Sequence, residues 1–195
     1  VMATFAMSEA LTIILKRNDP TAAAKQVSLT ELGSIKINKE ERGKMYKTIP
    51  RSSVIGFLIG VLPGAGATIA SFLAYGMERN LVKDEEKEKF GKGSVNGLSA
   101  PETANNAACS GSFVPMLTLG IPGSGTTAVM LGALLGFGIQ PGPRLYMTNP
   151  EIFWSVIMSM YIGMVILLIL NLPLIPYIAR ILAVPKNYLI PLILF

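Results

Sequence analysis

The sequence predicts an all-α, polytopic membrane protein with two broken or re-entrant helix pairs, forming a fragment of a larger fold. Hydrophobic residues make up 51% of the 195 residues and charged residues only 15%, which is too apolar for an ordinary soluble domain. The stretches 52–77, 103–143 and 152–179 carry no charge, and each exceeds the roughly 20 residues needed to span hydrocarbon. Two of these stretches are interrupted by Pro-Gly-x-Gly motifs.

The first third of the chain is predicted to lead from a membrane helix through a polar segment into a broken membrane segment. Residues 1–15 are expected to end a membrane helix, and residues 16–51 hold nine basic against four acidic residues. Because an excess of positive residues beside a span marks the cytoplasmic side, residues 16–51 are predicted to be cytoplasmic. Residues 52–77 form the first broken segment, since proline removes a backbone donor and glycine loosens a helix.

Residues 78–97 are predicted to be a charged loop, with five basic residues between Arg79 and Lys92. If residues 52–77 crossed the membrane once, this loop would lie outside, against the positive-inside rule. A re-entrant pair of half-helices, each about 10 residues and about 15 Å long, returns the chain to the cytoplasm instead. The re-entrant interpretation is preferred, and a single crossing is the alternative.

Residues 98–112, "LSAPETANNAACSGS", are predicted to be a polar segment of the substrate site. Asn105 and Asn106 are costly to bury unless they are satisfied, so they are expected to bind substrate or to offer oxygens to a cation. Glu102 beside them is the candidate for ion coupling, by binding Na⁺ or by relaying a proton. A loop or helix cap at the membrane surface is the alternative for this segment.

The remaining segments are predicted to continue the membrane topology. Residues 113–139 form the second broken segment, and residues 140–151 form an outer loop with Arg144 as its basic residue. Residues 152–172 are the cleanest spanning helix. Residues 173–195 are expected to be a return helix and the start of the next span.

An internal repeat links the two broken segments. An offset of 59 residues places "LPGAGATIA" over "IPGSGTTAV". Matching interruptions indicate a transporter binding site, although kinks for helix packing are the alternative. The helix after each interruption begins with unsatisfied N–H groups that favour an anion. The predicted substrate-binding residues are Pro63, Gly64, Gly66, Thr68, Asn105, Asn106, Pro122, Gly123, Ser124, Gly125, Thr126 and Thr127.

Several other functions are not favoured by the sequence. From Gly120 the chain reads G-x-x-x-x-G-T-T, a P-loop pattern with Thr126 in place of the lysine, so nucleotide hydrolysis is not predicted. With no histidine, the usual base of a serine or cysteine protease and the familiar zinc patterns are missing. No enzyme activity, cofactor or metal is expected. The basic residues lie in loops between apolar segments, which fits membrane topology better than nucleic-acid binding.

Three runs resemble the large membrane subunit, TctA, of the tripartite tricarboxylate transporters. They are "GVLPGAGATIASFLAYGMER", "GLSAPETANNAACSG" and "PMLTLGIPGSGTTAVMLGALLGFGIQPGP". The resemblance implies a multi-pass subunit of the bacterial inner membrane that takes up carboxylates such as citrate on a Na⁺ or H⁺ gradient. It also implies a small membrane subunit and a periplasmic solute-binding protein as partners. Members of the family are longer, so the chain is expected to be an interior to C-terminal piece; a passive channel or structural subunit is the alternative function.

Overall fold

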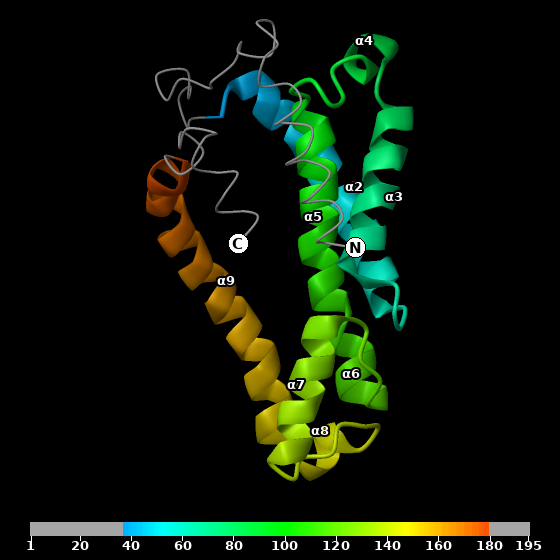
Figure 1. The fold of residues 1–195 in the computed structure, drawn as a ribbon, viewed down its shortest axis with the longest axis vertical. Coiled ribbons are helices and arrows are strands. Elements are labelled where there is room, and N and C mark those ends of the chain that lie inside the picture. The colour runs from blue at the N-terminus through cyan, green and yellow to red at the C-terminus, as the bar shows by residue number, and fades with distance from the viewer. Residues whose placement is uncertain (1–36, 180–195) are drawn as a thin grey trace, which may run out of the picture. The chain divides into compact units, whose positions relative to one another are not determined.

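The computed structural model describes residues 37–179, which are helical and contain no β-strand (Figure 1). The expected helix end at 1–15, most of the polar segment 16–51 and most of the segment 173–195 lie outside these residues. The all-α prediction is confirmed for the part described. The helices are α2 (Lys39–Val61), α3 (Gly66–Leu81), α4 (Asp84–Lys87), α5 (Val95–Gly111), α6 (Phe113–Leu119), α7 (Gly125–Gly136), α8 (Leu145–Thr148) and α9 (Pro150–Ala179).

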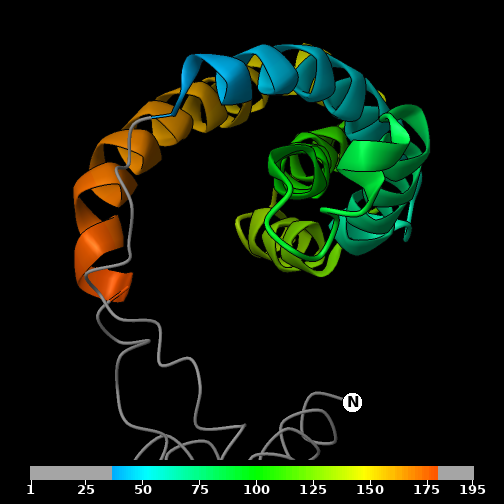
Figure 2. The same cartoon turned by 90° about the horizontal axis from the view of Figure 1, so that it is seen from above.

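Helices α2, α3 and α5 pack side by side within one compact unit, residues 37–162 (Figures 1 and 2). The contacts between α2 and α5 join Thr48 to Asn96, Gly56 to Ala104 and Gly60 to Ala108. The second residue of each pair comes 48 positions after the first. A constant separation means that α2 and α5 run parallel in a fixed register.

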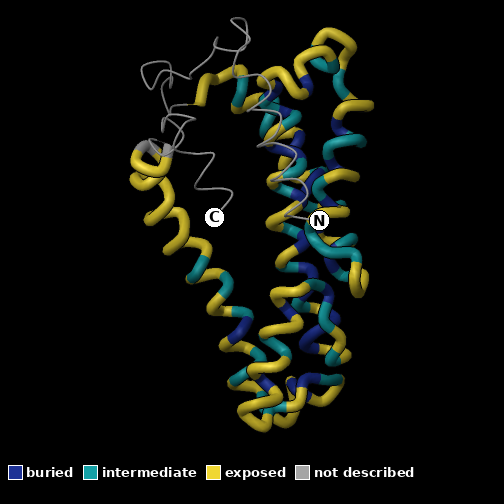
Figure 3. The backbone as a smooth tube through the Cα atoms, in the orientation of Figure 1, coloured by how far each residue is buried: buried dark blue, intermediate teal, exposed yellow. Residues whose placement is uncertain are grey.

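Small residues at four-residue spacing bring these helices into close contact. Gly56 and Gly60 of α2 lie so near α5 that an added Cβ would fall 2.3 Å from the carbonyl oxygens of Ala104 and Ala108. On α3, Ala70 completes the contact with these alanines. Residues four apart share one helix face, so small residues there allow backbones to approach as they do in membrane helix pairs. Many of the buried positions lie along this contact between α2, α3 and α5 (Figure 3).

Both Pro-Gly motifs coincide with gaps between helices. α2 ends at Val61 and α3 begins at Gly66, while α6 ends at Leu119 and α7 begins at Gly125. Gly64 and Gly66 adopt φ values of 80° and 68°, a left-handed conformation that favours glycine. The glycines of the first motif therefore allow the chain to reverse direction between α2 and α3.

A second cluster lies beyond the end of α5 and joins α6, α7, α8 and the first turns of α9. Its side chains are larger than those of the α2–α5 contact and lie around the fully buried Met116. This cluster fixes the short helices by ordinary apolar packing. Its other buried members are Leu117, Leu134, Leu145 and Val156.

The helix boundaries differ from the expected segments at several places, and α3 continues past residue 77 to Leu81, inside the expected charged loop. α2 begins at Lys39, inside the polar segment, and α5 begins at Val95, inside the charged loop. α9 continues through Pro173 to Ala179 instead of ending at residue 172. A proline removes one helical hydrogen bond, and a long apolar helix tolerates this loss when the residues on both sides continue it. Residues 150–175 form the one helix of the described chain that is long and apolar enough to cross a membrane by itself.

Candidate functional site

The second interruption contains a complete helix cap. Ser124 Oγ accepts a hydrogen bond from the Thr127 amide at 3.2 Å, and Thr127 Oγ1 accepts one from the Ser124 amide at 2.9 Å. Thr127 is 1% exposed, so its hydroxyl serves the start of α7. Thr126 and Gly125 beside it are exposed. Among the predicted hydroxyl groups of this interruption, Thr126 is therefore the one most open to a ligand.

The first interruption lacks such a cap. Ala65 stands at the position that the repeat aligns with Ser124, and its methyl side chain cannot accept a hydrogen bond. The first amides of α3 consequently have neither a helical partner nor a side-chain cap. Thr68, on the first turn of α3, is exposed, as are Pro63 and Gly64. The two repeats share a template but present different groups to their surroundings.

The structure brings the second interruption against the helix that leads into the first. A Cβ placed on Gly123 would lie 3.2 Å from the carbonyl oxygen of Gly60 and 2.9 Å from the Cβ of Ser112. Gly60 lies in the last turn of α2, and Ser112 joins α5 to α6. Pro122 is half-buried beside this contact. The end of α2, the end of α5 and the second interruption thus meet at one place.

A polar stripe leads along α5 towards this meeting place. Glu102, Asn105, Asn106 and Cys109 are exposed and follow helical spacing, on positions other than the buried Ala104. Asn106 Nδ2 donates to the Glu102 carbonyl at 2.9 Å, and the Cys109 thiol donates to Asn105 Oδ1 at 3.8 Å. In the described chain the two asparagines therefore keep further hydrogen-bonding capacity on the open side of the helix.

Glu102 lies at the far end of this stripe from the interruptions. It lines a groove of about 410 Å³ between the start of α2 and the start of α5, together with Glu41, Ser99 and Thr103. Nine helical residues separate Glu102 from Gly111, which corresponds to about 13 Å along α5. The structure therefore separates the predicted coupling acid from the meeting place of the interruptions.

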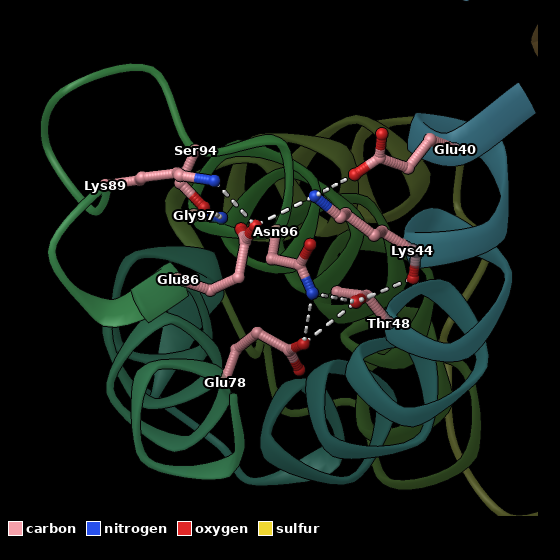
Figure 4. A network of polar contacts seen from close by, with 9 residues as sticks. All are labelled: Glu40, Lys44, Thr48, Glu78, Glu86, Lys89, Ser94, Asn96 and Gly97. Atoms are coloured by element: carbon pink, nitrogen blue, oxygen red, sulfur yellow. Dashed lines mark hydrogen bonds and ion pairs between the residues drawn. The ribbon is translucent and has the colours of Figure 1, made fainter. Parts of the chain in front are cut away.

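A buried carboxylate that the sequence did not predict links α2, α3 and α5 (Figure 4). Glu78 is fully buried on α3 and accepts hydrogen bonds at 2.9 Å from Thr48 of α2 and from Asn96 of α5. Arg51 of α2 forms an ion pair with its other oxygen. The prediction had placed residue 78 in a charged loop. The four-residue spacing of Ala70, Ala74 and Glu78 is the signal that could have assigned it to the buried face of α3.

A second ionic contact joins the two charged segments at the same end of these helices. Lys44 Nζ of α2 lies 2.8 Å from Glu86 Oε1 of α4 and 3.0 Å from Glu40 Oε1 (Figure 4). The hydrogen bonds that Lys44 donates, first to Glu86 and then to Glu40, raise the pKa of Lys44. The hydrogen bonds from Lys44 and then Lys89 lower the pKa of Glu86. The beginning of α2 and the loop after α3 therefore lie side by side.

Among residues 37–179, no group of three or more His, Cys, Asp or Glu side chains gathers as a metal site would require. The polar groups near the interruptions are amides, hydroxyls and carboxamides. Such groups can bind a carboxylate through hydrogen bonds.

Comparison with known proteins decides the family. The Tripartite tricarboxylate transporter TctA family matches residues 1–195. The chain belongs to the TctA family. Two similar proteins come from Agrobacterium vitis. One is the "Uncharacterized 52.8 kDa protein in TAR-I ttuC' 3'region", 40% identical over 177 residues, which cover 91% of this chain and 35% of the relative.

The second of these proteins is the "Uncharacterized protein in TAR-II ttuC' 3'region", 47% identical over 138 residues, covering 71% of this chain and 56% of the relative. The chain thus spans about a third of the first relative and just over half of the second. No solved structure matches this TctA chain. The family assignment agrees with the resemblance seen in the three sequence runs.

Proposed function

We propose that the chain is part of the membrane subunit of an ion-coupled secondary transporter that takes up tricarboxylates or related small organic anions. A periplasmic solute-binding protein delivers the anion, and a small membrane subunit completes the assembly in the bacterial inner membrane. The observation that carries the proposal is the polar stripe of α5, which leads to the place where the second interruption meets the end of α2. TctA family membership supports the transporter class.

The charge pattern supports a site inside the membrane. Asn105 and Asn106 lie within the charge-free stretch 103–143 and are exposed in the described chain. Lipid-facing carboxamides would be costly, so this face of α5 borders a wet cavity or other parts of the protein. The matched relatives are longer than this chain and have further residues to enclose such a cavity.

The helix arrangement supports the re-entrant interpretation of residues 52–77. The apolar part of α2, residues 52–61, measures about 15 Å, half of a hydrocarbon core of about 30 Å. The ion pair between Lys44 and Glu86 holds the two charged ends of the α2–α3 hairpin together. The hairpin thus enters from the cytoplasmic side, reaches the middle of the bilayer at Pro63 and returns.

The anion is held mainly by backbone amides in this proposal. The uncapped start of α3 offers amides next to Thr68, and the start of α7 offers those of Gly125 and Thr126 ahead of its cap. Helix N-termini stabilise negative charge without a lysine. Asn105 and Asn106 add side-chain donors, and Glu102 couples transport to Na⁺ or H⁺.

Uptake of radiolabelled citrate tests the site in the full-length parent, assembled with its small membrane subunit and solute-binding protein. Asn105→Ala and Thr126→Val should each raise KM about tenfold or more, because each removes a hydrogen bond worth at least about 1.5 kcal/mol to a charged ligand. Asn80→Ala, an exposed asparagine at the end of α3, is the matched control. An unchanged KM in both site variants would remove the proposed site.

Ion coupling is tested by the Na⁺ dependence of uptake at fixed membrane potential. Loss of the Na⁺ or pH dependence in Glu102→Gln would support its coupling role. Uptake by Glu102→Gln that keeps the wild-type ion dependence would exclude that role.

A further inference from the structure

Three glycines from distant segments meet where the two interruptions approach each other. Gly60 belongs to the last turn of α2, Gly111 ends α5, and Gly123 lies in the second interruption. A Cβ on Gly111 would lie 2.5 Å from the Phe57 carbonyl oxygen and 3.2 Å from Gly60 Cα, and one on Gly123 would lie 3.2 Å from the Gly60 oxygen. Gly60 therefore contacts both of the other glycines.

These positions require glycine because of space and not because of backbone conformation. None of the three has a φ in the left-handed region, so any residue could adopt their backbone angles. A Cβ on Gly60 would lie 2.3 Å from the Ala108 carbonyl oxygen, and real Cβ atoms do not approach so closely. Glycine loses more conformational entropy than other residues when the chain folds. At these positions the close backbone contacts that only glycine allows offset this loss.

We propose that Gly60, Gly111 and Gly123 form a glycine junction that sets the position of the second interruption relative to the first. The residues are positioning residues, because their backbones contact each other while the anion contacts the helix starts beside them. This role rests on the proposed function: two amide groups can hold one carboxylate substrate only when their separation matches it. A small displacement of one group is enough to weaken binding or transport substantially.

The contact of Gly56 on α2 with Ala104 on α5 shows why the junction differs from simple helix packing. Gly56 is as tightly packed against Ala104 as Gly60 is against Ala108, with a distance of 2.3 Å from the added Cβ to the oxygen in both cases. Gly56 lies one turn away, however, and its three nearest neighbours all belong to Ala104, whereas Gly60 also lies 3.2 Å from an added Cβ on Gly111 and from one on Gly123. Crowding at Gly56 should disturb α2 against α5, whereas crowding at the junction should also move the second interruption.

A second-site rescue provides the sharpest test. In Gly123→Ala the new methyl group would meet Ser112 Cβ at 2.9 Å, and Ser112→Gly removes that atom. The next contacts, Ser112 Cα at 3.1 Å and the Gly60 oxygen at 3.2 Å, need shifts of only a few tenths of an ångström. Gly123→Ala should raise KM for citrate about tenfold in the assembled full-length transporter, and Ser112→Gly/Gly123→Ala should restore most of it.

Two further variants separate positioning from general damage. Gly56→Ala should lower thermal stability and the amount of active protein, and therefore Vmax, without raising KM. Gly132→Ala on α7, where an added Cβ meets nothing within 4 Å, should change neither quantity. A rise in KM in Gly56→Ala equal to that in Gly123→Ala would reduce the junction to ordinary packing and overturn the proposal.

A distance measurement tests the structure of the glycine junction independently of transport activity. Spin labels at Leu62 and Ile121, both exposed, flank the junction, and pulsed electron resonance measures the distance between them. Gly123→Ala should shift or broaden this distance, and the double variant with Ser112→Gly should return it to the wild-type value. An unchanged distance in Gly123→Ala, or no return in the double variant, would overturn the junction.

The two readouts separate failure of the junction from failure of the proposed function. A distance that shifts and returns while KM for citrate stays constant would overturn the positioning role. Failure of the Asn105→Ala and Thr126→Val tests would instead remove the anion site, and the spin-label distances would still report on the contact among the glycines.

Discussion

Glu78 is a charged side chain that the described structure encloses completely. Thr48, Arg51 and Asn96 supply a hydroxyl, a guanidinium and a carboxamide to its two oxygens. A buried carboxylate is costly unless charge and hydrogen bonds compensate it, and here both are present. Glu78 lies on α3 and its partners come from α2 and α5. It therefore links α2, α3 and α5 at their charged end.

We expect Glu78→Gln to lower the free energy of unfolding by about 2 kcal/mol, because Arg51 and Asn96 would lose their charged partner. Thermal unfolding of the full-length parent in detergent would measure the change. Glu85→Gln, at an exposed position of α4, is the matched control and should have no measurable effect. Equal stability of the two variants would show that the buried network contributes little.

The two interruptions differ as structural elements although their sequences align. Ser124 and Thr127 form a reciprocal cap at the start of α7, while Ala65 leaves the start of α3 without one. The second interruption therefore has its own hydrogen bonds, and Gly123 in it lies against Gly60 and Ser112. The first depends on its glycine conformations and on the packing of α3 against α5.

Ser124→Ala should destabilise the start of α7 by about 1 kcal/mol, the usual effect of losing an N-cap side chain. Hydrogen exchange of the amides around Thr127 should become faster in the full-length protein. Ser124→Thr keeps the hydroxyl and should retain the wild-type exchange rate. If Ser124→Ala changed citrate uptake with no effect on exchange, Ser124 would be a ligand for the substrate and its capping role would be minor.

At the scale of the whole molecule, the antiparallel α2–α3 hairpin determines the proposed topology. Its two charged ends are joined by Lys44 and Glu86, so the segments on either side of the hairpin lie at one end of it. This contact supports the expectation, drawn from the basic residues of both segments, that they share the cytoplasmic side.

Cysteine accessibility in the full-length parent would test this topology. Cysteines placed at Arg42 and Glu85 should both react with a membrane-impermeant reagent from the cytoplasmic side only. A cysteine at Tyr146, in the expected outer loop, should react from the opposite side. Reaction of position 85 from the outer side would show that residues 52–77 cross the membrane once.

The sequence by itself determined the helical class, the family resemblance and the sites where the helices break. Proline lacks an amide donor and glycine tolerates left-handed angles, so the interruptions at Pro63 and Pro122 follow from local chemistry. Hydropathy likewise depends on composition alone, which is why the apolar stretches could be recognised without a fold. The helix limits near residues 95 and 172 were misplaced because packing and helix continuation outweighed local signals.

Only the tertiary structure decided which polar groups are exposed to a ligand and which distant segments contact each other. Thr127 looked like a ligand for the substrate, yet it is buried in a cap, and Glu78 looked like a loop residue, yet it is enclosed among three helices. The contacts of Gly60 with Gly111 and Gly123 join residues far apart in the chain. Such contacts depend on helix register and crossing, which segments far apart in the chain determine together.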